Sequence, residues 1–192
     1  MSYSRGRMDA LTDGVFAIAM TLLVLELRIP ETVTTAAFGH ALVETVPRLA
    51  VYALSFFTLG LSWLGRAQMR GAAEEISRGE AMLSLVYLFF VTIVPFSSML
   101  VGRYDEAPLA LWFYCANLGA IGLTSAGLRF MLPRADTDDP PGRRVGASLL
   151  LAVSALGAAA LAPIFRDGHA LWALAINVLG PWLDRMLRKK AS

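Results

Sequence analysis

Six long apolar stretches, separated by shorter polar segments, dominate the hydrophobic pattern of the chain. A helix that crosses a bilayer needs about 20 residues, because about 30 Å of hydrocarbon is spanned at about 1.5 Å per residue. The first stretch reaches this length only when Asp13 and Glu26 are included in it. The pattern predicts six transmembrane helices, with approximate spans 8–29, 43–65, 81–102, 107–130, 145–165 and 168–187. We therefore expect an all-α polytopic membrane protein, a single six-helix transmembrane domain over residues 1–192.

Lysine and arginine are distributed unevenly between the two sides that six spans define. Thirteen of the seventeen basic residues fall on the side that holds the two termini and the segments 66–80 and 129–144. The other side holds Arg28, Arg48, Arg103 and Arg166. Basic residues accumulate in the cytoplasmic loops of membrane proteins. The asymmetry predicts that both termini are cytoplasmic in a multi-pass protein of the plasma membrane.

The composition excludes several classes of protein. Hydrophobic residues make up 56% of the chain and charged residues 17%, against about 25% charged in a typical soluble domain. One cysteine excludes an internal disulfide framework or a thiolate zinc site, and two histidines leave little for metal chemistry. A net charge of +2 is too small to indicate nucleic-acid binding. We expect no metal site, no cofactor and no nucleic-acid partner.

The first helix differs from the other five because it carries ionisable groups. Asp13 lies near its cytoplasmic end, whereas Glu26 and Arg28 lie at its far end. Such groups inside a membrane segment usually face an interior or a water-filled path. Asp13 either caps a helix that begins there or belongs to a helix that begins upstream. Glu26 and Arg28 have the simpler explanation of reaching outward to the membrane surface.

A set of residues in the middle of this helix shares one face. At about 100° per residue, these are Gly14, Ile18, Thr21, Leu22 and Leu25. Periodicity alone favours a seam that packs on a neighbouring helix, and it leaves a pore-lining face open as the alternative. Thr21 is the polar member of the set, and a hydroxyl bonded back to its own helix would explain it equally well.

The segment from Arg7 to Glu26 closely resembles the first-helix motif of the bacterial potassium channels of the transmembrane protein 175 family. The motif has three residues between Arg and Phe-Ser-Asp, and here three residues separate Arg7 from Leu11-Thr12-Asp13. An apolar run similar to the family's follows, from Gly14 to Leu25. Leu11 stands in the place of Phe, and Thr12 in the place of Ser, where it keeps the hydroxyl.

The resemblance implies a homotetrameric channel in the lipid bilayer for potassium and other monovalent cations, with the first helices lining a central pore. Apolar side chains form the constriction in this family, and the corresponding positions are Ile18, Leu22 and Leu25. The threonine linked to modest potassium selectivity corresponds to Thr21. The motif residues Arg7, Leu11, Thr12 and Asp13 are assigned by resemblance to a packing and hydrogen-bond network near the cytoplasmic end.

Two other classes of function remain for comparison. An enzyme needs a nucleophile with a base, yet His40 and His169 both fall near the outer surface and no Ser–His or Asp–Asp pair is evident within the spans. We therefore expect no enzymatic activity. A secondary transporter or proton-coupled carrier is the alternative function. Transporters favour internal repeats and midplane charges, which this sequence does not clearly show.

Overall fold

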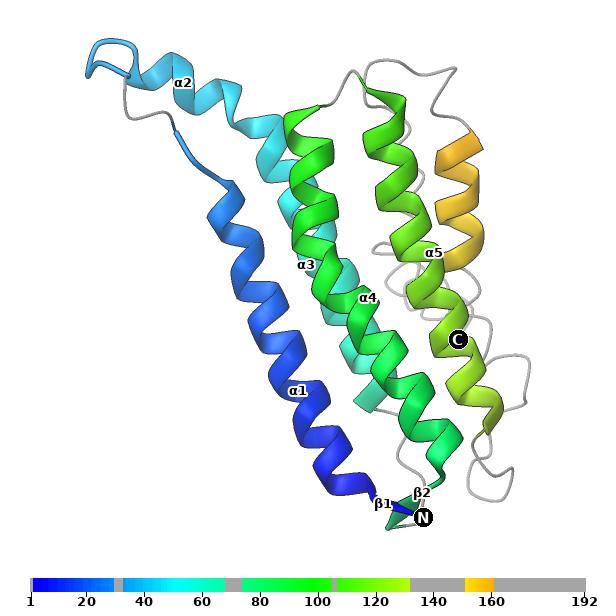
Figure 1. Ribbon diagram of the computed structural model, residues 1–192. Coiled ribbons are helices and arrows are strands. Elements are labelled where there is room, and N and C mark those ends of the chain that lie inside the picture. The colour runs from blue at the N-terminus through cyan, green and yellow to red at the C-terminus, as the bar shows by residue number, and fades with distance from the viewer. Residues whose placement is uncertain (1, 30–32, 68–73, 105–106, 132–150, 161–192) are drawn as a thin grey trace, which may run out of the picture.

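The computed structural model describes residues 2–29, 33–67, 74–104, 107–131 and 151–160 (Figure 1). Its elements are β1 (Tyr3–Ser4), α1 (Arg5–Leu22), the 3-10 helix η1 (Leu23–Glu26), α2 (Phe38–Glu44), α3 (Val46–Ala67), β2 (Glu75–Ile76), α4 (Arg78–Arg103) and α5 (Pro108–Met131). A shorter apolar helix covers Leu151–Ala160. The predicted all-α class is confirmed, since helices make up nearly all of the described part of the chain.

Four helices among the described residues are long and apolar enough to cross a membrane. They are Arg5–Glu26, Val46–Ala67, Arg78–Arg103 and Pro108–Met131. These bounds overlap the first four predicted spans, and Leu151–Ala160 falls inside the fifth. The sixth predicted span, 168–187, lies outside the described residues. The sixth span and the single six-helix domain stay predictions.

Local sequence explains several helix ends. The Ser77 side chain accepts a hydrogen bond from the backbone N–H of Glu80 at 3.1 Å, and this bond caps the N-terminus of α4. Pro108 opens α5 and Pro47 is the second residue of α3. Proline is tolerated in a first turn because the backbone N–H there has no partner within the helix. Residues at or next to the start of each of these helices therefore determine where the helix begins.

The long helices pack side by side as a bundle, with α4 between α1 and α5 (Figure 1). Phe16 of α1, Leu59 of α3, Tyr87 of α4 and Leu118 of α5 meet in the core, and all four are almost fully buried. The rings of Phe16 and Tyr87 lie 6.0 Å apart, centroid to centroid. This core joins α1 to the rest of the subunit along one side of the helix.

Polar side chains also pack inside the bundle, between α3, α4 and α5. The Ser55 hydroxyl donates to Ser98 at 3.0 Å and lies 2.9 Å from the Tyr114 hydroxyl. The Asn117 amide donates to Ser97 at 3.3 Å. Buried polar groups away from water need such partners. The contacts hold α3, α4 and α5 in one register.

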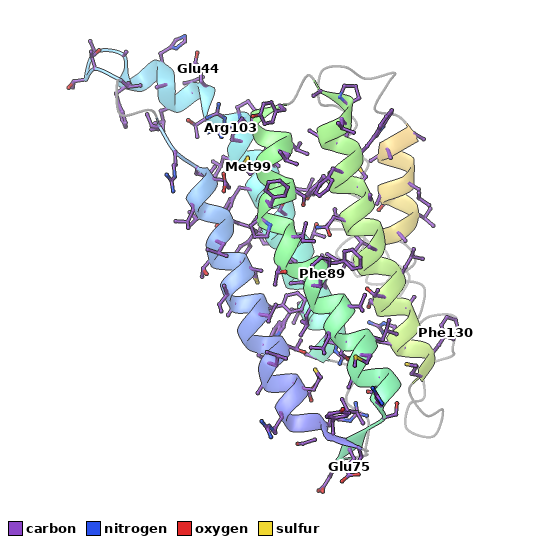
Figure 2. All side chains as sticks on the ribbon, viewed as in Figure 1. Glu44, Glu75, Phe89, Met99, Arg103 and Phe130 are labelled. Carbon is purple, nitrogen blue, oxygen red and sulfur yellow. The ribbon has the colours of Figure 1, made fainter. Side chains whose placement is uncertain are left out.

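The two ends of the bundle differ. At one end, α2 extends outward from the bundle on the side of α1 and leads into α3, and none of its residues is buried (Figure 1). Figure 2 places Glu44 and Arg103 at this end, and Glu75 and Phe130 at the opposite end. There β1 and β2 form a two-stranded antiparallel sheet beside the start of α1. The sheet joins the first residues of the chain to the segment before α4.

Candidate pore-lining face of α1

Helix α1 has a buried face and an exposed face. The side chains of Thr12, Phe16, Ala19 and Leu23 are buried against the other helices. At about 100° per residue, this buried face is centred about 145° around the helix from the centre of the face predicted to line a pore. The structure therefore packs α1 through the side opposite the predicted lining face.

The residues predicted to form the constriction are exposed in the single chain. The exposed fractions are 60% for Ile18, 43% for Leu22 and 50% for Leu25. A side chain added at Gly14 would meet no atom within 4 Å. Among the described helices, these residues do not form the packed seam that periodicity alone favoured. An apolar face of this kind, open in the subunit, is available to lipid, to a partner subunit or to a pore.

Leu25 lies in a different kind of helix from Ile18 and Leu22. The 3-10 helix η1 begins at Leu23, and its residues turn by about 120° each instead of about 100°. Leu25 is nevertheless half exposed on the same side.

Thr21 is exposed, and its hydroxyl donates to the backbone carbonyl oxygen of Ile18 at 2.8 Å. This is the back-bonded state that the sequence left open as an explanation for Thr21. The bond uses the hydroxyl proton and leaves the two lone pairs of the oxygen as acceptors. The oxygen therefore keeps the capacity to contact a cation on the exposed face.

Within the described residues, no hydrogen bond or ion pair joins the motif residues Arg7, Leu11, Thr12 and Asp13 to one another, and the network assigned to them by resemblance stays a prediction. Thr12 is buried, and its hydroxyl donates to the Met8 carbonyl oxygen at 2.8 Å. Arg7 and Leu11 are exposed on the same side of α1 as Ile18. Within the described residues, Arg7 makes no hydrogen bond or ion pair. Of these four residues, Asp13 is the one whose side chain makes a polar contact with another described helix.

The partner of Asp13 is a tryptophan that the sequence did not single out for this role. The Trp63 Nε1 donates to Asp13 Oδ1 at 2.8 Å, from α3 to α1. Because α1 begins at Arg5, Asp13 lies within the helix and does not cap it. A sequence signal existed, since an aspartate near the start of one span and an indole near the end of the antiparallel next span lie at similar depths. The contact fixes α1 against α3 at the cytoplasmic end predicted from charge.

In the ranges that the structure describes, no three His, Cys, Asp or Glu side chains gather into a set that could hold a metal ion. The exposed face of α1 offers apolar side chains and one hydroxyl.

Comparisons with known proteins identify relatives of the chain. The family described as endosomal/lysosomal potassium channel TMEM175 matches residues 7–95. A protein of Streptomyces collinus named as a potassium channel is 32% identical over 67% of this chain and 65% of its own length. A mouse protein named as an endosomal/lysosomal proton channel, TMEM175, is 24% identical over 68% of this chain and 27% of its own. The chain thus spans less than two thirds of the length of these curated relatives.

A solved structure shares the fold. The crystal structure of a lysosomal potassium-selective channel TMEM175 homolog from Chamaesiphon minutus has a TM-score of 0.68, with 25% sequence identity. The similarity covers 95% of this chain and 96% of the other. These relatives are named as ion channels and not as enzymes. The match begins at Arg7, the first residue of the motif, so the resemblance drawn from the motif is confirmed. Through these matches the chain is similar to the channels of the TMEM175 family.

Proposed function

We propose that this chain is the subunit of a homotetrameric cation channel with modest selectivity for potassium, located in the plasma membrane with both termini in the cytoplasm. Four copies of α1 line the central pore. The observation that carries the proposal is the apolar face of α1, which is exposed in the subunit and lies opposite the face that packs into it. The names of the relatives as potassium channels support the choice of ion.

An oligomer follows from the geometry of a single lining helix, and the resemblance to the family supports four copies. One helix cannot enclose an axis, so a pore lined by α1 requires symmetry copies of the subunit. Exposed large apolar side chains also need cover from lipid or protein. On the predicted lining face, Ile18 is the most exposed of the three constriction residues. Fourfold symmetry places four copies of each such side chain around the axis.

The constriction works by excluding water. Rings of Ile18, Leu22 and Leu25 offer no ligand that replaces the hydration shell of an ion, so a narrow ring dewets and blocks conduction. A small widening lets water and hydrated ions enter. Selectivity from such rings is modest because hydrated potassium and sodium differ little in the interactions that an apolar wall provides.

Thr21 supplies the polar contact that modest selectivity requires. Its hydroxyl proton is engaged with the Ile18 carbonyl, so the oxygen lone pairs are the groups that point away from the helix backbone. Four such oxygens form a ring of weak ligands between the Ile18 and Leu22 levels. Weak ligands fit a path that ions must enter and leave quickly.

A secondary transporter or proton-coupled carrier is the competing function, and the naming of the mouse relative as a proton channel makes protons a second candidate ion. Transport by a carrier saturates and depends on a coupling ion, whereas a channel shows discrete current steps that are linear in voltage near the reversal potential. The two mechanisms therefore differ in a direct recording.

The experiment is purification, native mass spectrometry and reconstitution into planar bilayers. We expect four chains in the particle and single-channel steps under opposed potassium and sodium gradients. The reversal potential should favour potassium by a modest factor, and a pH gradient alone should measure the proton share. A stable monomer that conducts, or flux that saturates and requires a counter-ion, would refute the proposal.

A further inference from the structure

The cytoplasmic end of α1 is tied to the segment before α4. Strands β1 and β2 pair in antiparallel register with Ser4 opposite Glu75, and the backbone N–H of Arg5 donates to the Glu74 carbonyl oxygen at 2.9 Å. Figure 2 shows Glu75 at the same end of the bundle as the start of α1. A pair of two-residue strands is marginal on its own. Its stability therefore depends on contacts beside it.

An ion pair provides such a contact. Arg5 Nη1 lies 3.1 Å from Glu80 Oε1, and the two side chains are only 11% and 9% exposed. Glu80 lies in the first turn of α4, where a carboxylate also interacts favourably with the helix dipole. Exposed ion pairs contribute little to stability, but removing one partner of a mostly buried pair leaves an uncompensated charge. Arg5 and Glu80 therefore hold the two segments together firmly.

The attachment at Arg5 lies at one end of α1, so movement there can be transmitted along the helix to the other end. Phe16 is almost fully buried at the middle of α1, about 17 Å along the helix from Arg5, and Leu25 lies about 14 Å beyond it. Rocking of α1 about Phe16 by 2 Å or so at Arg5 would displace Leu25 by about 1.6 Å in the opposite direction. A change of that size in each of four subunits alters whether an apolar ring holds water.

We propose that Arg5 and Glu80 are positioning residues for the pore. Their ion pair, together with the β1–β2 sheet, anchors the cytoplasmic end of α1 and so sets the distance of the constriction residues from the pore axis. The inference rests on the proposed function because it concerns how the pore opens. Neither residue lines the conducting path or belongs to the motif that resembles the family.

The test compares single-channel recordings of the full-length protein and its variants. Glu80→Gln and Arg5→Gln should each shift the open probability in the same direction by about threefold or more. Unit conductance and reversal potential should stay unchanged because the lining side chains are intact. The charge-swapped variant Arg5→Glu/Glu80→Arg should return the open probability toward the wild-type value. Glu75→Gln is the matched control, since it neutralises an exposed carboxylate of the same segment and should gate as wild type.

A disulfide tests the role of position without relying on charge. The Arg5–Glu74 hydrogen bond makes Ser4 and Glu75 a non-hydrogen-bonded pair, with Cα atoms about 4.5 Å apart and within disulfide range. In the Glu80→Gln background, Ser4→Cys/Glu75→Cys should restore the wild-type open probability on oxidation and lose it again on reduction. The native Cys115 is buried and does not interfere.

Three results would overturn the inference. The first is that Glu80→Gln and Arg5→Gln have the wild-type open probability. The second is that the shifts in open probability add in the charge-swapped variant instead of cancelling. The third is that the cross-linked protein keeps the open probability of Glu80→Gln alone. Each of these presumes wild-type currents, which are recorded in the same bilayers. Wild-type tetramers that carry no potassium current would overturn the proposed function and this inference with it, so the two failures are distinguishable.

Discussion

Leu22 and Leu23 are neighbours in the sequence with opposite environments, and replacing each by asparagine gives a sharp test of the lining face. Leu22 is 43% exposed in the subunit, whereas Leu23 is 1% exposed in the core. Leu23→Asn removes packed methyl groups and buries an amide, which should lower the free energy of unfolding by about 3 kcal/mol or more. Leu22→Asn should cost about 0.5 kcal/mol, as exposed substitutions usually do.

The two variants should therefore separate conduction from folding. Size-exclusion profiles and thermal melts should show an intact Leu22→Asn tetramer and a destabilised or unassembled Leu23→Asn protein. In planar bilayers, Leu22→Asn should raise the conductance or the leak, because an amide in the ring removes the barrier to wetting. Intact Leu22→Asn tetramers with unaltered currents would refute a pore-lining role. Loss of assembly in both variants would instead indicate that the exposed face packs on a neighbouring subunit.

Three further predictions use other contacts. Thr21→Val should shift the reversal potential measured between potassium and sodium while the tetramer stays intact. Thr21→Ser, which keeps the hydroxyl, should leave the reversal potential unchanged. An unchanged reversal potential in Thr21→Val would show that the Thr21 oxygen is not a ligand. Asp13→Ala and Trp63→Phe should each lower the free energy of unfolding by about 1–3 kcal/mol. The double variant should lose less than the sum of the two, because each substitution removes the same charge-assisted bond. Additive losses in thermal melts would contradict that coupling. Tyr114→Phe should lower the free energy of unfolding by about 1 kcal/mol and leave ion preference unchanged, as calorimetry and reversal potentials can check, because its bond to Ser55 lies away from α1.

The sequence predicted which residues of the candidate site share one face of the first helix, but not what that face contacts. The period of about 3.6 residues places Ile18 and Leu22 on one face, and in the structure these side chains share the exposed side of α1. Periodicity could not decide between a packed seam and an open face, because both produce an apolar stripe. The burial of the opposite face, through Phe16 and Leu23, depends on where α3 and α4 lie.

The sequence by itself determined the helical membrane class and which residues share one face of α1, because hydropathy and helical period are local properties of consecutive residues. The tertiary structure alone decided which distant groups meet. The bond from Trp63 to Asp13 and the ion pair of Arg5 with Glu80 join residues 50 and 75 positions apart. Such contacts follow from helix tilt, rotation and relative depth, which arise when all the helices pack together. No pattern within a single segment encodes them, and for that reason the residues that hold α1 in place became visible only in the folded subunit.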